Sequence, residues 1–219
     1  DLGIPESGNG IPDVIDELEW GMDWALTMQA ADGGVFWRLA SRRWDDGLPA
    51  TVSEPRLLAE RTTHATAVFA AMAAINARLL RPMRAERADR LLRAAESAWR
   101  FVEDRPQYPA EGERFVNPEG VAAGEYPDRS ARDARAWAAA ELFRTTRERA
   151  YLEAFDGLFA GLKLDPTAPV SFHDQGMAAA WAYLMTPDPR RDPDLVERAR
   201  RALLAGADWR LEQMESHPF

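Results

Sequence analysis

The chain has 219 residues, of which 46% are hydrophobic and 29% charged, a composition typical of a folded soluble domain with a substantial core. Its net charge of −9 makes nucleic acid or an anionic membrane a poor partner and a neutral ligand a better one. The lack of cysteine excludes disulfides and thiolate metal sites, and only three histidines make a His-rich zinc centre improbable. The sequence also contains no run of about eighteen apolar residues, the length that a membrane-spanning helix needs.

The first predicted element is a helix that follows a glycine-rich loop. Residues 4–17 read IPESGNGIPDVIDE. Pro12 suits the first helical position, and Asn9 or Gly10 can cap the helix. The acidic residues that follow favour the positive end of the helix dipole. The helix is expected to run from about residue 12 to about residue 31.

The rest of the chain is predicted to be helical, apart from one short extended run. Turn signals at Gly33 and Gly34 precede residues 35–40, which could form one arm of a small hairpin or an ordered loop. Breaks between the later segments are too short to be domain linkers, so residues 1–219 are expected to form one domain of successive αα-hairpins. Helical spacing of apolar residues predicts helices near 63–80, 82–104, 130–146, 148–161, 174–186 and 192–215.

Two of these helices, 63–80 and 130–146, carry alanine on more than one face. Small side chains allow close backbone approach on several sides, as an inner layer of helices requires. The more amphipathic segments 82–104 and 192–215 are then expected to be outer helices. Periodicity by itself therefore predicts an all-α assembly of inner and outer helices.

Three motifs, in order, resemble one known family. Residues 4–17 continue into EWGMDW at 19–24, residues 62–73 read TTHATAVFAAMA, and residues 133–142 read DARAWAAAEL. Together they resemble glycoside hydrolase family 9, the inverting cellulases, over essentially the whole chain. The resemblance implies an (α/α)6-barrel-type fold, of which about seven helices would form an incomplete, open arc. Remaining segments of the same domain, or a second copy, would close it.

The resemblance also implies the parent protein's activity. Family members hydrolyse β-1,4-glucan with inversion, using an Asp base upstream of the glycine-rich loop and a Glu acid near the C-terminus. Neither motif lies in this chain, so the fragment alone is expected to be inactive and the parent protein an extracellular endoglucanase. Carboxylates at Asp45–Asp46, at Glu125 with Asp128, and near Asp13 are better explained as turn, loop and helix-start residues.

The candidate substrate-binding residues follow from the cleft at one end of such a barrel. Sugar rings expose C–H surfaces that stack on aromatic faces, and histidines can bind hydroxyls. Residues 35–38 read VFWR where many relatives have Val-Tyr-His-Lys, and His64 lies at a helix start that Thr63 is expected to cap. The candidates are Phe36, Trp37, Trp44, His64, Tyr126 and His173. Packing or surface roles are the alternatives, and the tryptophans at 20, 24, 99, 137, 181 and 209 are expected in the core.

No cofactor is expected to be required, but one branch of the family holds a structural calcium ion. The matching residues here are Asp133 and Asp174, the latter in SFHD at 171–174. Ala134 replaces the paired Glu of the family, which removes a ligand from an ion that takes about six to eight oxygens. Capping of helix N-termini is the alternative role for both aspartates.

Two other readings of the function remain open at this point. One is a non-catalytic helical module that binds saccharide or a partner protein. The other is a different αα-toroid hydrolase or lyase, which three ordered motifs disfavour. Within the leading reading, the partner is a β-glucan or a related oligosaccharide.

Overall fold

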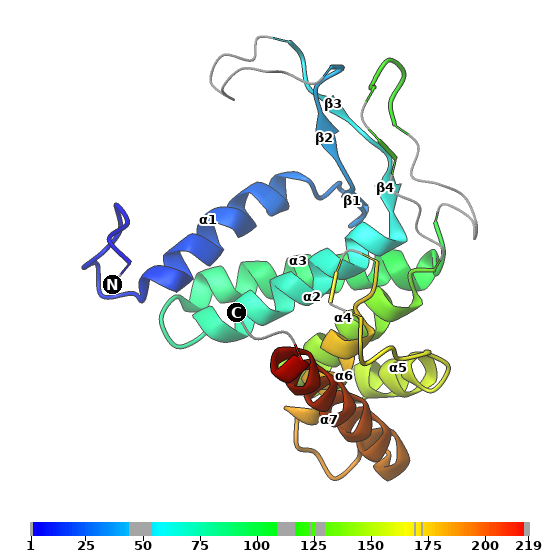
Figure 1. Ribbon diagram of the computed structural model, residues 1–219. Coiled ribbons are helices and arrows are strands. Elements are labelled where there is room, and N and C mark those ends of the chain that lie inside the picture. Colours follow the sequence, from blue (N-terminus) through cyan, green and yellow to red (C-terminus); the bar gives the residue numbers. More distant parts are fainter. Residues whose placement is uncertain are drawn as a thin grey trace.

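The computed structural model describes residues 2–43, 54–108, 117–122, 124–125, 130–168, 170–171 and 173–216. In this part of the chain the protein is mostly helical, as predicted (Figure 1). None of the described helices is long and apolar enough to cross a membrane. The helices are α1 (Asp13–Thr27), α2 (Thr63–Leu80), α3 (Ala85–Asp104), α4 (Arg132–Thr146), α5 (Arg149–Phe159), α6 (Gly176–Leu184) and α7 (Pro193–Ser216).

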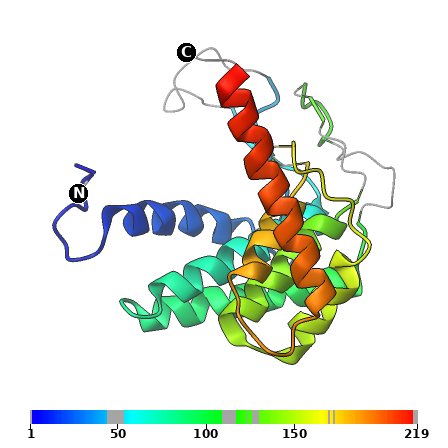
Figure 2. The ribbon, with the colours of Figure 1, turned by 60° about the horizontal axis from the view of Figure 1, so that its bottom comes forward.

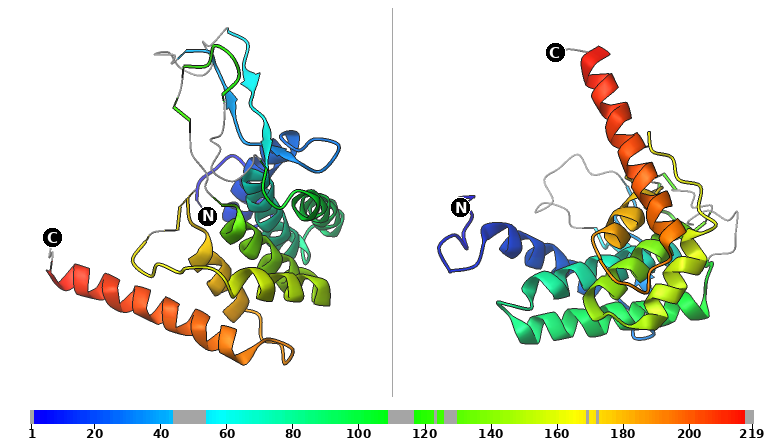
Figure 3. Two further views of the ribbon diagram at one scale, coloured as in Figure 1. Left: turned by 90° about the vertical axis from the view of Figure 1, so that its right-hand side faces the viewer. Right: turned by 90° about the horizontal axis from the view of Figure 1, so that it is seen from below.

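The helices form two layers of αα-hairpins. Helix α4 packs between α2 and α6, and these three form one layer. Helices α3, α5 and α7 each return along a member of that layer, which makes α2, α4 and α6 parallel to one another. Helix α1 and the second half of α7 extend beyond the packed layers (Figures 2 and 3).

Alanine lets the inner helices approach closely. Both alanine-rich segments lie in this layer, and α2 and α4 pack directly on each other. Because a methyl group barely separates two helix backbones, α4 can be covered on several sides at once. The fully buried alanines are Ala67, Ala70, Ala71, Ala73, Ala74 and Ala77 in α2, and Ala134, Ala136, Ala138 and Ala139 in α4.

The extended run after α1 is one arm of an antiparallel ladder. Strand β1 (Val35–Phe36) pairs with β4 (Arg61–Thr62), and β2 (Leu39–Ala40) pairs with β3 (Leu57–Leu58). Two further hydrogen bonds join the pairs: the Trp37 N–H donates to the Glu60 carbonyl at 3.2 Å, and the Ala59 N–H donates to the Arg38 carbonyl at 3.0 Å. The ladder leads directly into α2.

The turn before β1 packs tightly against α3. Gly33 has φ of +90°, and a Cβ atom there would lie 2.3 Å from the carbonyl oxygen of Ser97. Only glycine tolerates both the left-handed backbone and this contact. The turn therefore fixes where the hairpin leaves the helical layers.

The helix starts differ from the sequence prediction in two places. Helix α2 is capped by Thr62, whose hydroxyl accepts from the Ala65 N–H at 3.1 Å, rather than by Thr63. Helix α1 has no side-chain cap, because the Asn9 side-chain oxygen accepts from the Ile11 N–H at 2.7 Å, ahead of the helix. The Asn9 amide group also donates to Asp16 at 3.1 Å. It also ends earlier than predicted, since Gln29 already pairs with Val35.

The prediction that the helical tryptophans lie in the core is correct for Trp99 and wrong for three others. Trp99 is 4% exposed, whereas Trp20, Trp24 and Trp181 are 76%, 55% and 54% exposed. Helical spacing identifies an apolar face but not which neighbouring element covers it.

Candidate functional site

The N-termini of α2, α4 and α6 lie at the same end of the inner layer. The Gln175 N–H, just before α6, donates to the Asp133 carboxylate in the first turn of α4 at 2.8 Å. At the start of α2, the Thr63 hydroxyl donates to the carbonyl of Arg105, which follows α3, at 2.7 Å. Three helix N-termini, each with partial positive charge, therefore face one region.

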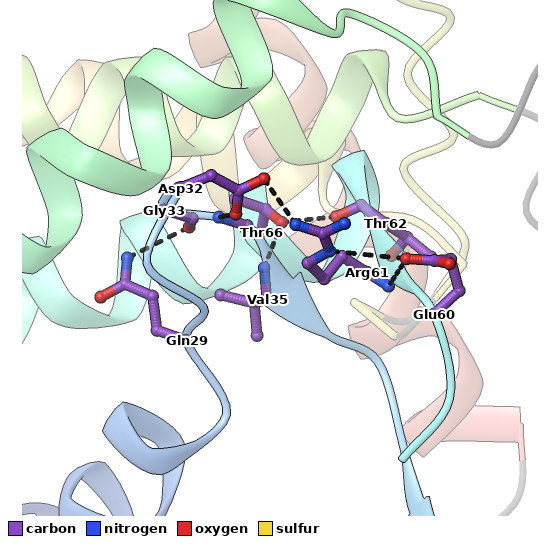
Figure 4. A network of polar contacts seen from close by, with 9 residues as sticks. Gln29, Asp32, Gly33, Val35, Glu60, Arg61, Thr62 and Thr66 are labelled. Atoms are coloured by element: carbon purple, nitrogen blue, oxygen red, sulfur yellow. Dashed lines mark hydrogen bonds and ion pairs between the residues drawn. The ribbon is translucent and has the colours of Figure 1, made fainter.

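The hairpin is attached to this end by a buried threonine. The Thr66 hydroxyl donates to the Thr62 carbonyl at 2.6 Å and accepts from the Val35 N–H at 2.9 Å (Figure 4). One side chain in the first turns of α2 thus holds β1 in place. Phe36 and Trp37 follow Val35 directly and are positioned by this contact.

An ion pair closes the same junction. Arg61 on β4 pairs with Asp32 at 2.5 Å, and the Gly34 N–H donates to the other oxygen of Asp32 at 3.1 Å (Figure 4). Partial burial opposes ionisation of Asp32, but the Gly34 N–H and the Arg61 guanidinium outweigh it and lower its pKa. The Gln29 amide adds a hydrogen bond to the Gly33 carbonyl at 3.1 Å.

The two described aromatic candidates are half-buried on the hairpin. Phe36 packs against the core, with the Arg61 guanidinium 6.0 Å from its ring centroid. Trp37 has the Arg38 guanidinium 5.4 Å from its ring centroid. Trp44 and Tyr126 lie outside the described residues.

The two histidine candidates are in different environments. His64, in the first turn of α2, is only 7% exposed and lies near enough to Asp133 for its charge to favour the ionised carboxylate. The alternative role of a surface histidine is therefore wrong. His173 is exposed, and its backbone N–H donates to the Ser171 hydroxyl at 3.2 Å. Both residues lie at the N-terminal end of the inner layer.

Asp133 and Asp174 flank the start of α6. Asp174 accepts from the Gly176 N–H at 2.8 Å, as Asp133 accepts from that of Gln175. Burial raises the pKa of Asp133, while the Gln175 N–H and His64 oppose that rise. Helix-start contacts thus occupy one oxygen of each carboxylate.

These two carboxylates fall short of a calcium site by themselves. An ion of that kind takes about six to eight oxygens, and Ala134 supplies none from its side chain. The described residues contain no group of three or more His, Cys, Asp or Glu side chains that could hold a metal ion. The calcium site implied by the resemblance stays a prediction.

Two polar residues of this end were not among the sequence candidates. Thr66 carries a signal, because its position four residues after Thr62 allows its hydroxyl to bond that carbonyl. Gln175 carries none. Gln175 is 4% exposed, and its side-chain amide donates to the Ser171 carbonyl at 2.5 Å, while its backbone N–H bonds Asp133.

At the opposite, C-terminal end of the inner layer, called here the closed end, an ion pair joins two of the helices. Arg78 of α2 pairs with Glu141 of α4 at 2.8 Å and also donates to the Thr145 hydroxyl at 2.8 Å. Beside this pair is a largely apolar groove of about 640 Å³, lined in part by Trp137, Trp181 and Arg210.

A second cleft, of about 590 Å³, lies between the N-terminal loop, α1 and α3. Its inner charges are paired. Arg84 contacts Asp16 at 3.2 Å and Glu19 at 3.0 Å, and Arg87 contacts Glu19 at 3.3 Å. This cleft lies by the N-terminus of α1, away from the end where β1 joins α2.

Comparison with known proteins gives one consistent result. The family model described as glycosyl hydrolase family 9 matches residues 4–186. Endoglucanase D of Acetivibrio thermocellus is 32% identical over 221 aligned positions, which cover 100% of this chain and 35% of that protein. A xyloglucan-specific endo-β-1,4-glucanase of Bacteroides ovatus is 33% identical, over 100% of this chain and 38% of that protein.

Solved structures agree. A metagenome-derived glycoside hydrolase family 9 endoglucanase is 34% identical and superposes with a TM-score of 0.83, over 94% of this chain and 36% of that one. The chain thus spans about a third of the length of these relatives. Its helices correspond to part of the (α/α)6 barrel of those enzymes. The sequence and the fold together show that the chain belongs to glycosyl hydrolase family 9.

Proposed function

We propose that this chain forms the central part of the catalytic domain of an endoglucanase that hydrolyses β-1,4-glucan with inversion. The observation that carries the proposal is the convergence of three helix N-termini beside an aromatic hairpin, in a chain of this family. Aromatic faces stack on the C–H surfaces of sugar rings, and polar side chains at such an end can hydrogen-bond sugar hydroxyls. Phe36, Trp37, His64 and His173, together with Trp44 and Tyr126, are the proposed substrate-binding residues.

Inverting hydrolysis requires two carboxyl groups about 6.5 to 9.5 Å apart, one to protonate the leaving oxygen and one to activate water. Described carboxylates that were candidates by count have structural partners. Asp13 accepts from the Ser7 hydroxyl at 2.6 Å, and Asp16 pairs with Arg84. We therefore assign the acid and the base to segments outside these 219 residues, which align with only about a third of the relatives' length.

Those further segments are also the proposed partners of the exposed apolar surface. Trp20 and Trp24 on α1 and Trp181 at the apolar groove are more than half exposed. Large apolar side chains exposed to this degree are expected to be covered by a partner surface. The rest of the same domain would cover it and close the barrel, and a second copy of the chain is the alternative. An extracellular location and a reaction without a cofactor complete the proposal.

The test is release of reducing sugar from a soluble β-1,4-glucan. Two proteins are compared: this chain alone, and the same 219 residues placed within a complete family 9 domain whose flanking segments come from Endoglucanase D. Activity only in the complete domain supports the proposal. Activity of the chain alone would place the acid and base inside it, and inactivity of both would favour the non-catalytic saccharide-binding module.

A further inference from the structure

A separate segment of the chain lies against the hairpin. Residues 117–122 and 124–125 run beside the arm of the hairpin that carries β2, about 80 positions away in sequence (Figures 1 and 3). Three hydrogen bonds join the two. The Arg38 guanidinium donates to the Asn117 side-chain oxygen at 3.0 Å and to the Gly124 carbonyl at 2.8 Å, and the Ala122 N–H donates to the Arg42 carbonyl at 3.0 Å.

Arg38 also links this contact to the aromatic part of the hairpin. Its guanidinium lies 5.4 Å from the ring centroid of the preceding residue, Trp37. The same charged group therefore contacts Trp37 on its own strand and two acceptors on the other segment. Hydrogen bonds from a charged donor are stronger than those between neutral groups. The segment itself is further ordered because the Asn117 N–H donates to the Glu125 carboxylate at 3.1 Å.

We propose that Arg38 is a positioning residue that fastens residues 117–122 and 124–125, called here the segment, to the hairpin, so that the two form one wall of the proposed saccharide-binding site. This inference rests on the proposed function for the ligand, but not for the contact itself. Arg38 acts through the segment and through Trp37, and it need not touch the saccharide. Its loss is expected to release the segment while leaving the helical layers intact, because the contact lies outside the core.

The experiment uses the full 219-residue chain with two measurements. Hydrogen exchange of the Ala122 amide reports whether the segment is fastened, and calorimetric titration with cellotetraose reports saccharide affinity. Arg38→Gln is expected to speed Ala122 exchange at least tenfold and weaken affinity at least fivefold, with an unchanged Tm. Asn117→Ala removes one of the two bonds and should give a smaller effect, which adds little to Arg38→Gln in the double variant.

Arg56→Gln is the matched control. Arg56 is an exposed arginine just before β3, the partner strand of β2, and none of the hydrogen bonds that join the segment to the hairpin comes from it. It should change neither measurement.

The outcomes separate the contact from the function. Unchanged Ala122 exchange in Arg38→Gln would overturn the fastening role. Faster exchange with unchanged affinity would make Arg38 a tether without a positioning role and would also overturn the inference. A third outcome is that the unaltered chain shows no affinity for cellotetraose, although Arg38→Gln speeds Ala122 exchange. The contact between Arg38 and the segment would then stand, but saccharide binding by this chain, and with it the positioning role of Arg38, would be overturned.

Discussion

The two ends of the inner helical layer use polar side chains in opposite ways. At the C-terminal end, Arg78 pairs with Glu141, while Arg191 donates to the Tyr183 carbonyl at 2.8 Å. At the N-terminal end, Thr62 and Asp133 accept backbone N–H groups. Both arrangements follow from the helix dipole, which favours cations at C-termini and acceptors at N-termini.

The difference shows where this fold can carry a ligand site. At the C-terminal end, charged side chains satisfy one another and the helix carbonyls within the layer. At the N-terminal end, the chain leaves the layer as a hairpin and loops that bring His173 and Trp37 to the same region. Loops on a rigid scaffold are where binding residues concentrate. The comparison predicts that substitutions at the closed, C-terminal end affect stability most. Those at the N-terminal end, called here the open end, should affect it less.

The largest effect is expected from Glu141→Ala at the closed end. The Glu141 side chain is 5% exposed and that of Arg78 is 25% exposed. Removing the carboxylate leaves a mostly buried guanidinium without its counter-charge, which should lower the free energy of unfolding by about 2–4 kcal/mol. Urea denaturation measures this loss.

Two variants test that reasoning. The double variant Arg78→Met/Glu141→Leu removes both charges and should lose much less than Glu141→Ala. Glu153→Ala breaks an exposed pair with Arg149, whose side chains are 62% and 77% exposed, and should cost less than about 0.5 kcal/mol. A similar loss in Glu153→Ala and Glu141→Ala would remove the contrast between buried and exposed pairs.

A smaller loss is expected from Thr62→Val at the open end. Valine keeps the shape of threonine but cannot cap α2 by accepting from the Ala65 N–H. Loss of a cap costs about 1 kcal/mol. Thr27→Val, at the exposed end of α1, is the control and should stay within about 0.5 kcal/mol in the same denaturation assay. A loss above that of Glu141→Ala would reverse the order of the two ends.

The smallest effect is expected from Asp133→Asn, and it depends on pH. Burial raises the pKa of Asp133 in the folded chain. The stability from its protonated form is therefore fully present below the usual Asp pKa and is lost as the pH rises through the folded pKa. Asparagine keeps an acceptor for the Gln175 N–H without the charge, so the variant should gain stability relative to the unaltered chain between pH 4 and pH 7.

Urea midpoints at the two pH values measure this change. If Asp133→Asn became relatively less stable at pH 7, the ionised carboxylate would be favoured in the folded chain, and His64 rather than burial would dominate its environment. The exposed, uncharged Gln213 offers a control, since Gln213→Ala removes no titratable group and should shift the midpoint equally at both values.

Much of the helical architecture could be predicted because it is set by local pattern. The segment 63–80 was predicted and observed with the same bounds, since its alanines and apolar residues repeat at helical spacing throughout. The extended run at 35–40 was predicted from its turn glycines. Its partner strands were not, because pairing between residues 17 to 27 positions apart leaves no mark on either strand.

The candidate site was less predictable. The start of α2 was recognised, and His64 was placed there correctly, but its burial depends on neighbouring elements far away in sequence. The hydrogen bonds of Arg38 to Asn117 and Gly124 likewise join parts of the chain that no local pattern connects. For Trp20 and Trp181 the error had the same origin, since apolar character gives a preference for burial but not a partner.

By itself, the sequence determined the number and type of helices, the alanine-rich inner layer and, through its motifs, membership of glycosyl hydrolase family 9. These depend on side-chain size and hydrogen bonding within a few residues. Only the tertiary structure decided which end of the layer gathers His64, Asp133 and Gln175, and which apolar faces stay exposed. Those properties depend on which helices become neighbours, and that choice is made by packing over the whole chain rather than by any one segment.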